Sequence, residues 1–376
     1  MRISAARTLA LLLVGFVGLA GSAAQGQQLT PLYNFCAQAN CTDGSAPSGS
    51  LIQGSDGNFY GTTLSGGKYG QGTVFKVTPT GTLTPLYSFC AIGTDCTDGA
   101  QPGAGVIEGI DGNFYGTTVG GGLAGTYDEC GGANNLGGAP AIFTCGTVFK
   151  LTPNGELTTL YTFCSPIEVV NGNTCGDGSN PEAALIQDGD GNFYGTTPRG
   201  GTGGAGAGTI FELSPEPDGG CPAGSNPGNG YCEKVIYNTC QSNGCGWGPS
   251  ALIQGPDSSF YGAMGAGLGV PGDDGSLFEI TPSSGNLTTL FYFCTSGSTC
   301  PAGDGAEPLG VIQGNDGNLY GTTYLYGNTG GVGGAVFQFN PNTPALNVLY
   351  VFCSLTDCAD GRGPTSGVIQ GSDGDF

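Results

Sequence analysis

The sequence predicts an all-β fold, a β-propeller built from four-stranded blades. The main evidence is the octapeptide DGNFYGTT, which recurs with small changes in copies that start at Asp56, Asp111, Asp190, Asp257 and Asp316. A sixth copy starts at Asp373 and is cut off at Phe376. Each copy sits in a unit with four apolar or β-branched runs separated by glycine-rich turns, which is typical of propeller blades.

The first complete unit supplies the pattern for the others. Its four expected strands are Ser50–Gln53, Phe59–Thr63, Thr73–Val77 and Leu83–Phe89. The turn between the first two contains Asp-Gly, a pair that tolerates positive φ. A glycine-rich loop separates the second and third strands, and a Thr-Pro-x-Gly turn separates the third and fourth. The second strand is rich in aromatic and β-branched residues, as strands are.

The later units keep this order, at Val106–Phe163, Leu185–Tyr237, Leu252–Phe293 and Val311–Phe352. Successive Asp-Gly turns are 55, 79, 67, 59 and 57 residues apart, and the extra length falls in loops. An open β-solenoid is the alternative architecture. We favour the propeller because a solenoid coil is usually much shorter than this unit.

The two ends of the chain suggest how the ring closes. Leu29–Phe35 matches a fourth strand, whereas the chain stops inside a second strand. We therefore expect one propeller domain over residues 25–376 with five complete blades and an incomplete sixth, truncated at the C-terminus. About 20 to 30 further residues would allow a six-bladed ring.

The first 24 residues predict a secretory signal peptide. Arg2 and Arg7 precede the apolar run Leu9–Leu19, and small residues follow up to Ala24. This order of charge, short apolar core and small-residue end is typical of a cleaved signal. A retained N-terminal anchor is the alternative, but no later stretch approaches the roughly 20 apolar residues of a membrane span.

Sixteen cysteines agree with export. An even number of cysteines in an exported chain indicates disulfides. They fall into eight close pairs: Cys36/Cys41, Cys90/Cys96, Cys130/Cys145, Cys164/Cys175, Cys221/Cys232, Cys240/Cys245, Cys294/Cys300 and Cys353/Cys358. Zinc is a poor alternative, because the chain has no histidine and a thiolate site would need distant loops to converge. We expect no metal and no cofactor.

The charge argues against two classes of partner. The chain carries a formal net charge of −21, with charged residues at only 10% of its composition. An acidic surface repels nucleic acid and anionic lipid. We therefore expect no nucleic-acid partner and no membrane span after signal cleavage. An extracellular glycan or a surface protein is the expected kind of partner.

Two consecutive runs in the first unit resemble a known repeat. GSDGNFYGTTLSGG at Gly54–Gly67 and GTVFKVTPTGTLTPLYSF at Gly72–Phe89 are similar to the Gloeo/Verruco repeat of the choice-of-anchor tandem repeat GloVer-containing proteins. The resemblance covers residues 29–376 and is weakest in the fourth unit, where Ala263-Met264 replaces Thr-Thr. It implies an exported surface protein with a C-terminal sorting anchor. It implies no established activity, so no catalytic residue is carried over.

An aspartate recurs just before each expected innermost strand. The candidate ligand-binding residues are Asp43, Asp98, Asp177, Asp304 and Asp360, with Trp247, the only tryptophan, at the equivalent place in the fourth unit. Long loops on a rigid scaffold are where binding residues usually lie. One interpretation is a ring of carboxylates at the channel mouth that binds a cation or sugar hydroxyls, with Trp247 as a stacking platform. The other is that each aspartate hydrogen-bonds its own Asp-Gly turn.

No set of residues resembles a catalytic site. Without histidine, acid–base chemistry would fall to Asp, Glu, Tyr or Lys, and no carboxylate pair stands out among the 29 acidic residues. Asp188–Asn192 matches the start of a calcium loop but lacks the glutamate that completes one. We predict a non-catalytic binding module for a glycan or protein. A carboxylate-dependent carbohydrate-active enzyme and a purely structural surface protein are the alternatives.

Overall fold

Five antiparallel sheets repeat along the chain in a computed structural model. The residues it describes are 30–93, 96–122, 145–164, 169–170, 174–202, 208–239, 248–265, 275–293, 305–325, 333–371 and 373–376. In each sheet the four main strands pair in chain order, first with second, second with third and third with fourth. This confirms the predicted all-β propeller of four-stranded blades.

Each blade runs from an innermost first strand to an outermost fourth strand. The first blade has β1 (Ser45–Gln53), β2 (Phe59–Ser65), β3 (Thr73–Val77) and β4 (Leu83–Ser88); the second has β5 (Ile107–Glu108), β6 (Phe114–Thr118), β7 (Thr147–Leu151) and β8 (Leu157–Thr162). The third has β11 (Ile186–Gln187), β12 (Phe193–Thr197), β13 (Thr209–Pro215) and β15 (Tyr231–Asn238); the fourth has β16 (Pro249–Gln254), β17 (Phe260–Met264), β18 (Ser276–Thr281) and β19 (Asn286–Tyr292). The fifth has β20 (Ala306–Gln313), β21 (Leu319–Leu325), β22 (Ala335–Asn340) and β23 (Ala345–Val351).

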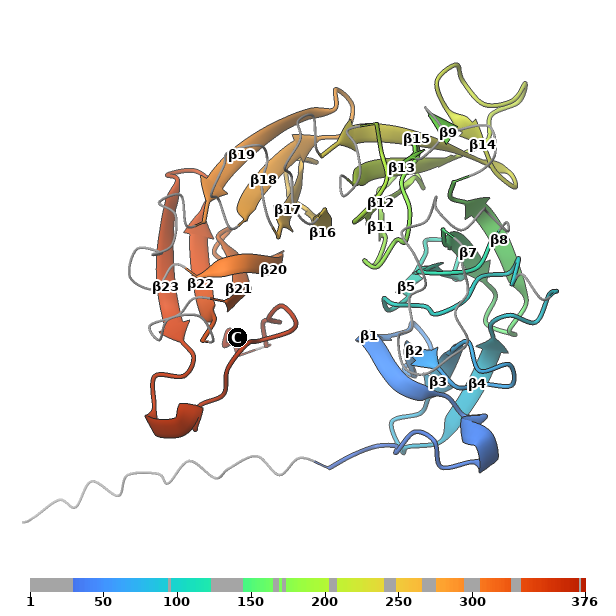
Figure 1. Cartoon of the computed structure of the whole chain (residues 1–376), viewed down its shortest axis with the longest axis horizontal. Coiled ribbons are helices and arrows are strands. Elements are labelled where there is room, and N and C mark those ends of the chain that lie inside the picture. The colour runs from blue at the N-terminus through green and yellow to red at the C-terminus, as the bar shows by residue number, and fades with distance from the viewer. Residues whose placement is uncertain are drawn as a thin grey trace, which may run out of the picture.

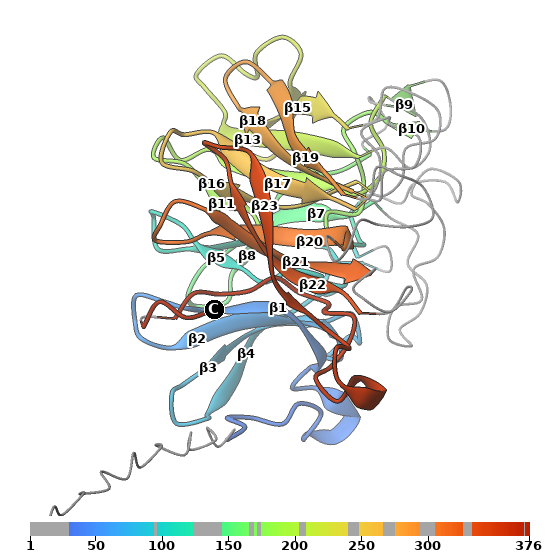
Figure 2. The ribbon, with the colours of Figure 1, turned by 90° about the vertical axis from the view of Figure 1, so that its left-hand side faces the viewer.

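Three short strands lie outside this scheme. β14 (Asn226–Pro227) adds a fifth strand at the outer edge of the third sheet, next to β15. β9 (Val169–Val170) and β10 (Thr174–Cys175) form a separate pair that projects from one face of the ring (Figure 2). β14 lies in the segment between β13 and β15, and β9 and β10 lie between the second and third blades.

The blades form an arc around a central axis (Figure 1). The first strand of every blade faces the centre and the fourth strand faces outward. The side view shows the strands running through the thickness of the ring (Figure 2). One end of the axis therefore collects the Asp-Gly turns, and the other collects the cysteine-bearing loops that join one blade to the next.

A glycine at the third position of each second strand lets strands two and three fit together. A Cβ atom placed on Gly116 would lie 2.7 Å from the Cζ atom of Phe149 on the adjacent strand β7. The ladder from β7 to β8 shifts register between Val148 and Phe149, and such a bulge re-aims a side chain locally. The equivalent pairs are Gly61–Phe75, Gly195–Phe211, Gly262–Phe278 and Gly321–Phe337.

The hydrophobic core lies between neighbouring blades. Tyr60 of the first blade stacks on Phe114 of the second, with ring centroids 4.0 Å apart. Phe89 meets Phe149 edge-on at 5.2 Å. Corresponding clusters join the second blade to the third, the third to the fourth and the fourth to the fifth. Because each blade buries its aromatic residues against the next, blades stabilise one another in sequence.

The segments that flank the five blades form no strand. Residues 30–35, expected as part of a fourth strand, and residues 359–371 and 373–376, expected to begin a sixth blade, lack ladder pairing. The helical elements of the described chain are two 3-10 turns, η1 (Ala39–Cys41) and η2 (Thr356–Cys358). Within the described ranges, no helix is long and apolar enough to cross a membrane.

Candidate functional site

Disulfides close the loops that connect one blade to the next. Five predicted pairs are confirmed: Cys36–Cys41, Cys90–Cys96, Cys164–Cys175, Cys221–Cys232 and Cys353–Cys358. Four of them follow an outermost strand or its equivalent, whereas Cys221–Cys232 ties the insert after β13 to strand β15.

The other three predicted pairs involve cysteines that the structure does not describe. Cys240 and Cys245 both lie outside the described residues, and so do Cys294 and Cys300. Cys130 also lies outside them, whereas Cys145, its predicted partner, is described and is disulfide-bonded. The pairing of Cys130 with Cys145, of Cys240 with Cys245 and of Cys294 with Cys300 therefore stays a prediction.

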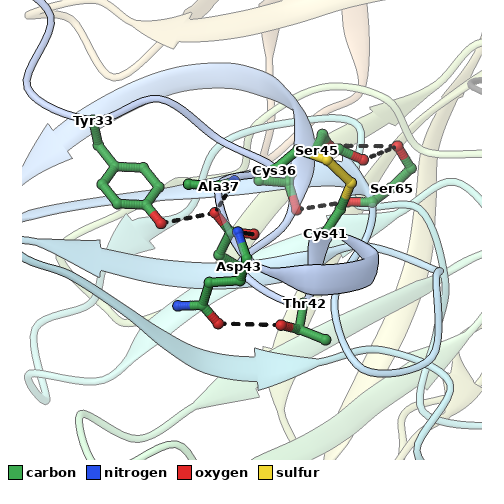
Figure 3. The surroundings of a disulfide bond; sticks show 10 residues. Tyr33, Cys36, Ala37, Cys41, Thr42, Asp43, Ser45 and Ser65 are labelled. Atoms are coloured by element: carbon green, nitrogen blue, oxygen red, sulfur yellow. Dashed lines mark hydrogen bonds between the residues drawn. A yellow bond between two sulfur atoms is a disulfide. The ribbon is translucent and has the colours of Figure 1, made fainter.

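The first predicted site residue, Asp43, is held inside its disulfide loop (Figure 3). The Tyr33 hydroxyl donates a hydrogen bond to its carboxylate at 2.7 Å. The backbone amides of Ala37 and Gln38 donate two more, at 2.9 and 3.2 Å. The side chain is fully buried. Its carboxylate therefore ties the cysteine loop to the segment that precedes it.

The same arrangement recurs at the other described aspartates. Asp98 accepts hydrogen bonds from the Tyr87 hydroxyl at 2.7 Å and from the amides of Ala91 and Ile92. Asp177 accepts bonds from the Tyr161 hydroxyl and the Cys164 amide. Asp360 accepts bonds from Tyr350, Ser354 and Leu355. Asp98 and Asp177 are buried, whereas Asp360 is half-buried.

These contacts change the acidity of both partners. Burial opposes ionisation of Asp43, but hydrogen bonds from Tyr33 and the loop amides outweigh it and lower the pKa of Asp43. The hydrogen bond to Asp43, with burial, raises the pKa of Tyr33. Burial and the Asp177 carboxylate raise the pKa of Tyr161. The Tyr33–Asp43 pair is therefore a neutral phenol and a carboxylate anion at neutral pH.

Sequence reasoning found these aspartates but not their partners. The partners are the tyrosine that precedes the first cysteine by three residues and backbone amides at or just after that cysteine, not the Asp-Gly turn itself. Trp247 and Asp304 lie outside the described residues. Phe291 stands where the partner tyrosine of Asp304 would stand, and it has no hydroxyl. A ligand-binding role for the six predicted positions stays a prediction.

A cavity of about 740 Å³ lies among the innermost strands. All five blades contribute to its lining, through Ser50, Gly105, Ala183, Ser250 and Leu309 among others. Small and apolar residues dominate the walls, with Glu182 and Glu307 as the charged members. A cavity of this size, lined mostly by apolar groups with a few polar ones, has the dimensions of a small-molecule or oligomer subsite.

The cavity reaches the end of the axis where the cysteine loops lie. Pro198, Gly265 and Tyr324 line it from the ends of second strands. In the antiparallel pairs these ends face the starts of the innermost strands, as the pairing of Ala306 with Leu325 shows. Glu307 begins such a strand. The two glutamates therefore lie toward the same end of the axis as the predicted aspartates.

Sequence reasoning missed both glutamates. Desolvation at the cavity wall raises the pKa of Glu182, although its side chain is solvent-exposed there, and the positive charge of Arg199 partly opposes this effect. A signal was present in the sequence. A proline follows each of the Asp-Gly pairs formed by the predicted aspartates, at the third position after the glycine, and only Pro181 and Pro308 among these prolines have an acidic neighbour, Glu182 and Glu307. The sequence of a single repeat does not indicate that the residues beside this proline line a cavity shared by all the blades.

The Asp-Gly turns at the opposite end satisfy their own polar groups. Asp111 accepts hydrogen bonds from Asn113 and from the Tyr115 hydroxyl, and it forms an ion pair with Lys150 at 2.8 Å. In the third blade Asp188, and not Asp190, takes this role by accepting bonds from Asn192 and Tyr194. The carboxylate that would begin a calcium loop is thus engaged within its own turn.

The described residues contain one cluster with the spacing of a metal site, formed by Cys145, Cys164 and Cys175. Cys164 and Cys175 are bonded to each other, and Cys145 is also in a disulfide. Metal coordination by cysteine needs thiolates. These sulfurs therefore do not suit a metal while the disulfides are intact.

Comparison with known proteins places the sequence in a repeat family. The model of the Gloeobacter/Verrucomicrobia repeat matches residues 21–221, 131–296 and 218–376. These three overlapping matches span the blades described above. No curated protein matches the chain.

Solved structures give distant likenesses. A protein of unknown function from Dyadobacter fermentans DSM 18053 is 13% identical with a TM-score of 0.46, over 83% of this chain and 84% of that chain. A chain of the nidogen/laminin complex is 13% identical with a TM-score of 0.44, over 81% and 79%. TolB from Acinetobacter baumannii is 12% identical with a TM-score of 0.40, over 81% and 53%. The propeller assignment rests on the strand pairings and not on these likenesses.

Proposed function

Because the chain belongs to the Gloeobacter/Verrucomicrobia repeat family and its five blades line one cavity, we propose that it is an exported, non-catalytic binding module. Its ligand is an extracellular glycan or a surface protein, bound at the cysteine-loop end of the central cavity. The observation that carries this proposal is the cavity itself, to which every blade contributes.

Export is supported by the disulfides and by the N-terminal sequence. Disulfides persist in oxidising compartments and are rare in the cytosol. Five are present among the described residues. Residues 1–24 have the composition of a secretory signal. We propose that they are removed and that residues 25–376 act as one unit.

The proposed ligand site combines the cavity with two predicted residues. Trp247 directly precedes Gly248 and Pro249, which line the cavity. Asp304 is three residues before Glu307, which also lines it. Indole rings stack on sugar and side-chain surfaces, and carboxylates accept hydrogen bonds from hydroxyl groups. In this proposal Asp43, Asp98, Asp177 and Asp360 fix the loops that present the site.

The glutamates favour a second candidate function, a carboxylate-dependent carbohydrate-active enzyme. Many glycosidases use two carboxylic acids, one with a raised pKa that acts as the general acid. Glu182 and Glu307 line the same cavity, and the pKa of Glu182 is raised. We prefer the binding function because binding requires only a ligand that is complementary to the cavity, whereas catalysis also requires a defined geometry of the two carboxylates.

A paired assay tests the two functions. The purified protein is screened for binding to immobilised polysaccharides and surface proteins, and every polysaccharide that binds is assayed for hydrolysis. Glu182→Gln with Glu307→Gln is compared with Glu156→Gln, because Glu156 lies in the turn between strands three and four, away from the cavity. We expect at least a tenfold loss of affinity in the double variant and no change in the control.

Binding without turnover that depends on the two glutamates supports the proposal. Turnover that the double variant loses establishes the enzyme instead. Binding that persists in Glu182→Gln with Glu307→Gln and in Trp247→Ala removes the cavity as the site. No binding to any glycan or protein tested favours the structural role.

A further inference from the structure

Two chain segments border the opening of the arc, residues 30–35 and residues 363–376 (Figure 1). Neither belongs to a sheet. The later segment nevertheless repeats the start of a blade. The amide of Gly371 donates to the Asp375 carbonyl at 2.7 Å, and that of Gly374 donates to the Gly371 carbonyl at 3.0 Å. Gly54 and Gly57 make the same two bonds in the first Asp-Gly turn.

Residues 363–376 also contact the fifth blade. These contacts are the same as those that each complete blade makes with the blade before it. Phe376 stacks on Tyr320 with ring centroids 3.9 Å apart, which compares with 4.0 Å for Phe114 on Tyr60. The Thr322 hydroxyl donates to the Ser366 carbonyl at 2.7 Å. Thr62, Thr117 and Thr196 make the equivalent bond to the next blade.

Residues 30–35 contact the first blade as an outermost strand contacts the next blade. Phe35 meets Phe75 edge-on at 4.9 Å, as Phe89 meets Phe149 at 5.2 Å. The carbonyl of Leu32 lies against Gly81, as the carbonyl of Leu86 lies against Gly155. This segment thus occupies the position of a fourth strand in a blade that precedes the first.

Apolar side chains at the opening are more exposed than their counterparts in the complete blades. Phe376 is 46% exposed, whereas Phe114 at the same repeat position is 2% exposed. Ile369 is 79% exposed, although Ile52, its counterpart in β1, packs against a core cluster. Phe352 is half-buried, whereas Phe89 is fully buried. What is missing is the contact that strands two and three would provide.

We propose that the opening is a docking site for a β-hairpin with this chain's own repeat sequence, that of residues 60–81, which supplies strands two and three of a sixth blade. In every complete blade the second strand pairs with the first and the third pairs with the fourth. The first strand of a docked hairpin would therefore lie beside residues 363–370, and its second strand would lie beside residues 30–35.

Side-chain chemistry also matches this occupant. The third strands of the first two blades carry lysine, and Lys150 forms an ion pair with Asp111 of its own Asp-Gly turn. Asp373 is the equivalent aspartate at the opening. A hairpin with the sequence of residues 60–81 would bring a lysine to Asp373 and a phenylalanine to Phe352, as Phe337 lies against Phe293.

The test extends the chain after Phe376 with the sequence of residues 60–81. The control carries a scrambled extension of the same composition, and a third variant has aspartate in place of the phenylalanine that corresponds to Phe75. We expect the native-order extension to raise Tm by at least about 5 °C and to protect the amides of residues 30–35 from hydrogen exchange. Neither control is expected to do so.

The peptide of residues 60–81, labelled with a fluorophore, gives the same test on the original chain. We expect it to bind, and the scrambled peptide not to bind. Equal Tm for native-order and scrambled extensions, together with absent peptide binding, overturns the proposal. So does a stable dimer of the original chain in which residues 30–35 and 363–376 become protected, because the occupant is then a second copy.

Discussion

Replacing Asp98 with alanine is expected to destabilise the fold, because its carboxylate is a buried structural acceptor. It is 1% exposed and accepts three hydrogen bonds, from the Tyr87 hydroxyl and the amides of Ala91 and Ile92. A hydrogen bond to a charged group contributes about 1.5–3 kcal/mol. Removing one partner of a buried charged network costs about 3–5 kcal/mol, since the remaining groups are left unpaired.

Thermal and denaturant unfolding under non-reducing conditions measure this effect. For a cooperative unit of about 300 residues, a loss of about 3–5 kcal/mol corresponds to a fall in Tm of about 5–8 °C. Asp218→Ala is the matched control, because Asp218 lies on an exposed turn, and its effect should stay within about 0.5 kcal/mol. Tyr87→Phe removes one of the three bonds and should cost about 1–2 kcal/mol.

A double-mutant cycle between Tyr87 and Asp98 isolates the shared bond. We expect Tyr87→Phe to have a much smaller effect in the Asp98→Ala background than in the wild-type chain. If Asp98→Ala melts within about 1 °C of the wild type and loses ligand binding instead, the carboxylate serves the ligand and not the loop. The structural role inferred for Asp43 and Asp177 would then also be wrong.

Three further outcomes follow from the geometry. Gly116→Ala should lower the free energy of unfolding by about 1–3 kcal/mol, because the new methyl group overlaps Phe149; denaturant unfolding checks this, and Gly189→Ala, which meets nothing within 4 Å, is the control. The pKa values of Asp43, Asp56 and Asp111 are lowered in the fold. Their contribution to the free energy of unfolding is therefore complete above about pH 4 and is lost as the pH falls through the pKa values of the folded state. Denaturant midpoints that stay constant below about pH 4 would contradict this expectation. Burial, with the negative charges of Glu279 and Asp257 nearby, raises the pKa of Tyr261 to about 12. Its contribution to the free energy of unfolding is therefore complete below about pH 10 and is lost as the pH rises above that value. Phenolate absorbance that titrates fully at about pH 10 in the folded protein would refute this expectation.

The repeat made the strands predictable to different degrees. The predicted third strand Thr73–Val77 coincides with β3, and the equivalent residues of the second unit form β7. Five consecutive β-forming residues between glycine and Thr-Pro leave little choice of boundary. Innermost strands were less predictable. β1 extends back to Ser45, whereas β5 contains two residues. Their length depends on the approach of neighbouring blades, which one repeat does not encode.

The candidate site was predictable in position but not in composition. Recurrence of an aspartate marked the loops that bear Asp43 and Asp98, but its partners come from a strand of the preceding unit. The cavity depends on five innermost strands meeting at one axis, so no single repeat marks Glu182 or Glu307. In the third blade the repeat alignment favoured Asp190, whereas the turn uses Asp188. The sequence does not distinguish these two carboxylates, which are two residues apart, and only the geometry of the turn shows which of them accepts the hydrogen bonds.

Hydrogen exchange with and without a bound ligand tests the central claim most directly. Once the screen yields a glycan or protein that binds, its addition should protect the innermost segments around residues 103–107, 182–184, 248–251 and 307–309, which line the cavity. The ligand should be recovered chemically unchanged. Protection confined to the Asp-Gly turns, such as residues 54–58 and 109–113, would place the site at the opposite end of the axis and contradict the account.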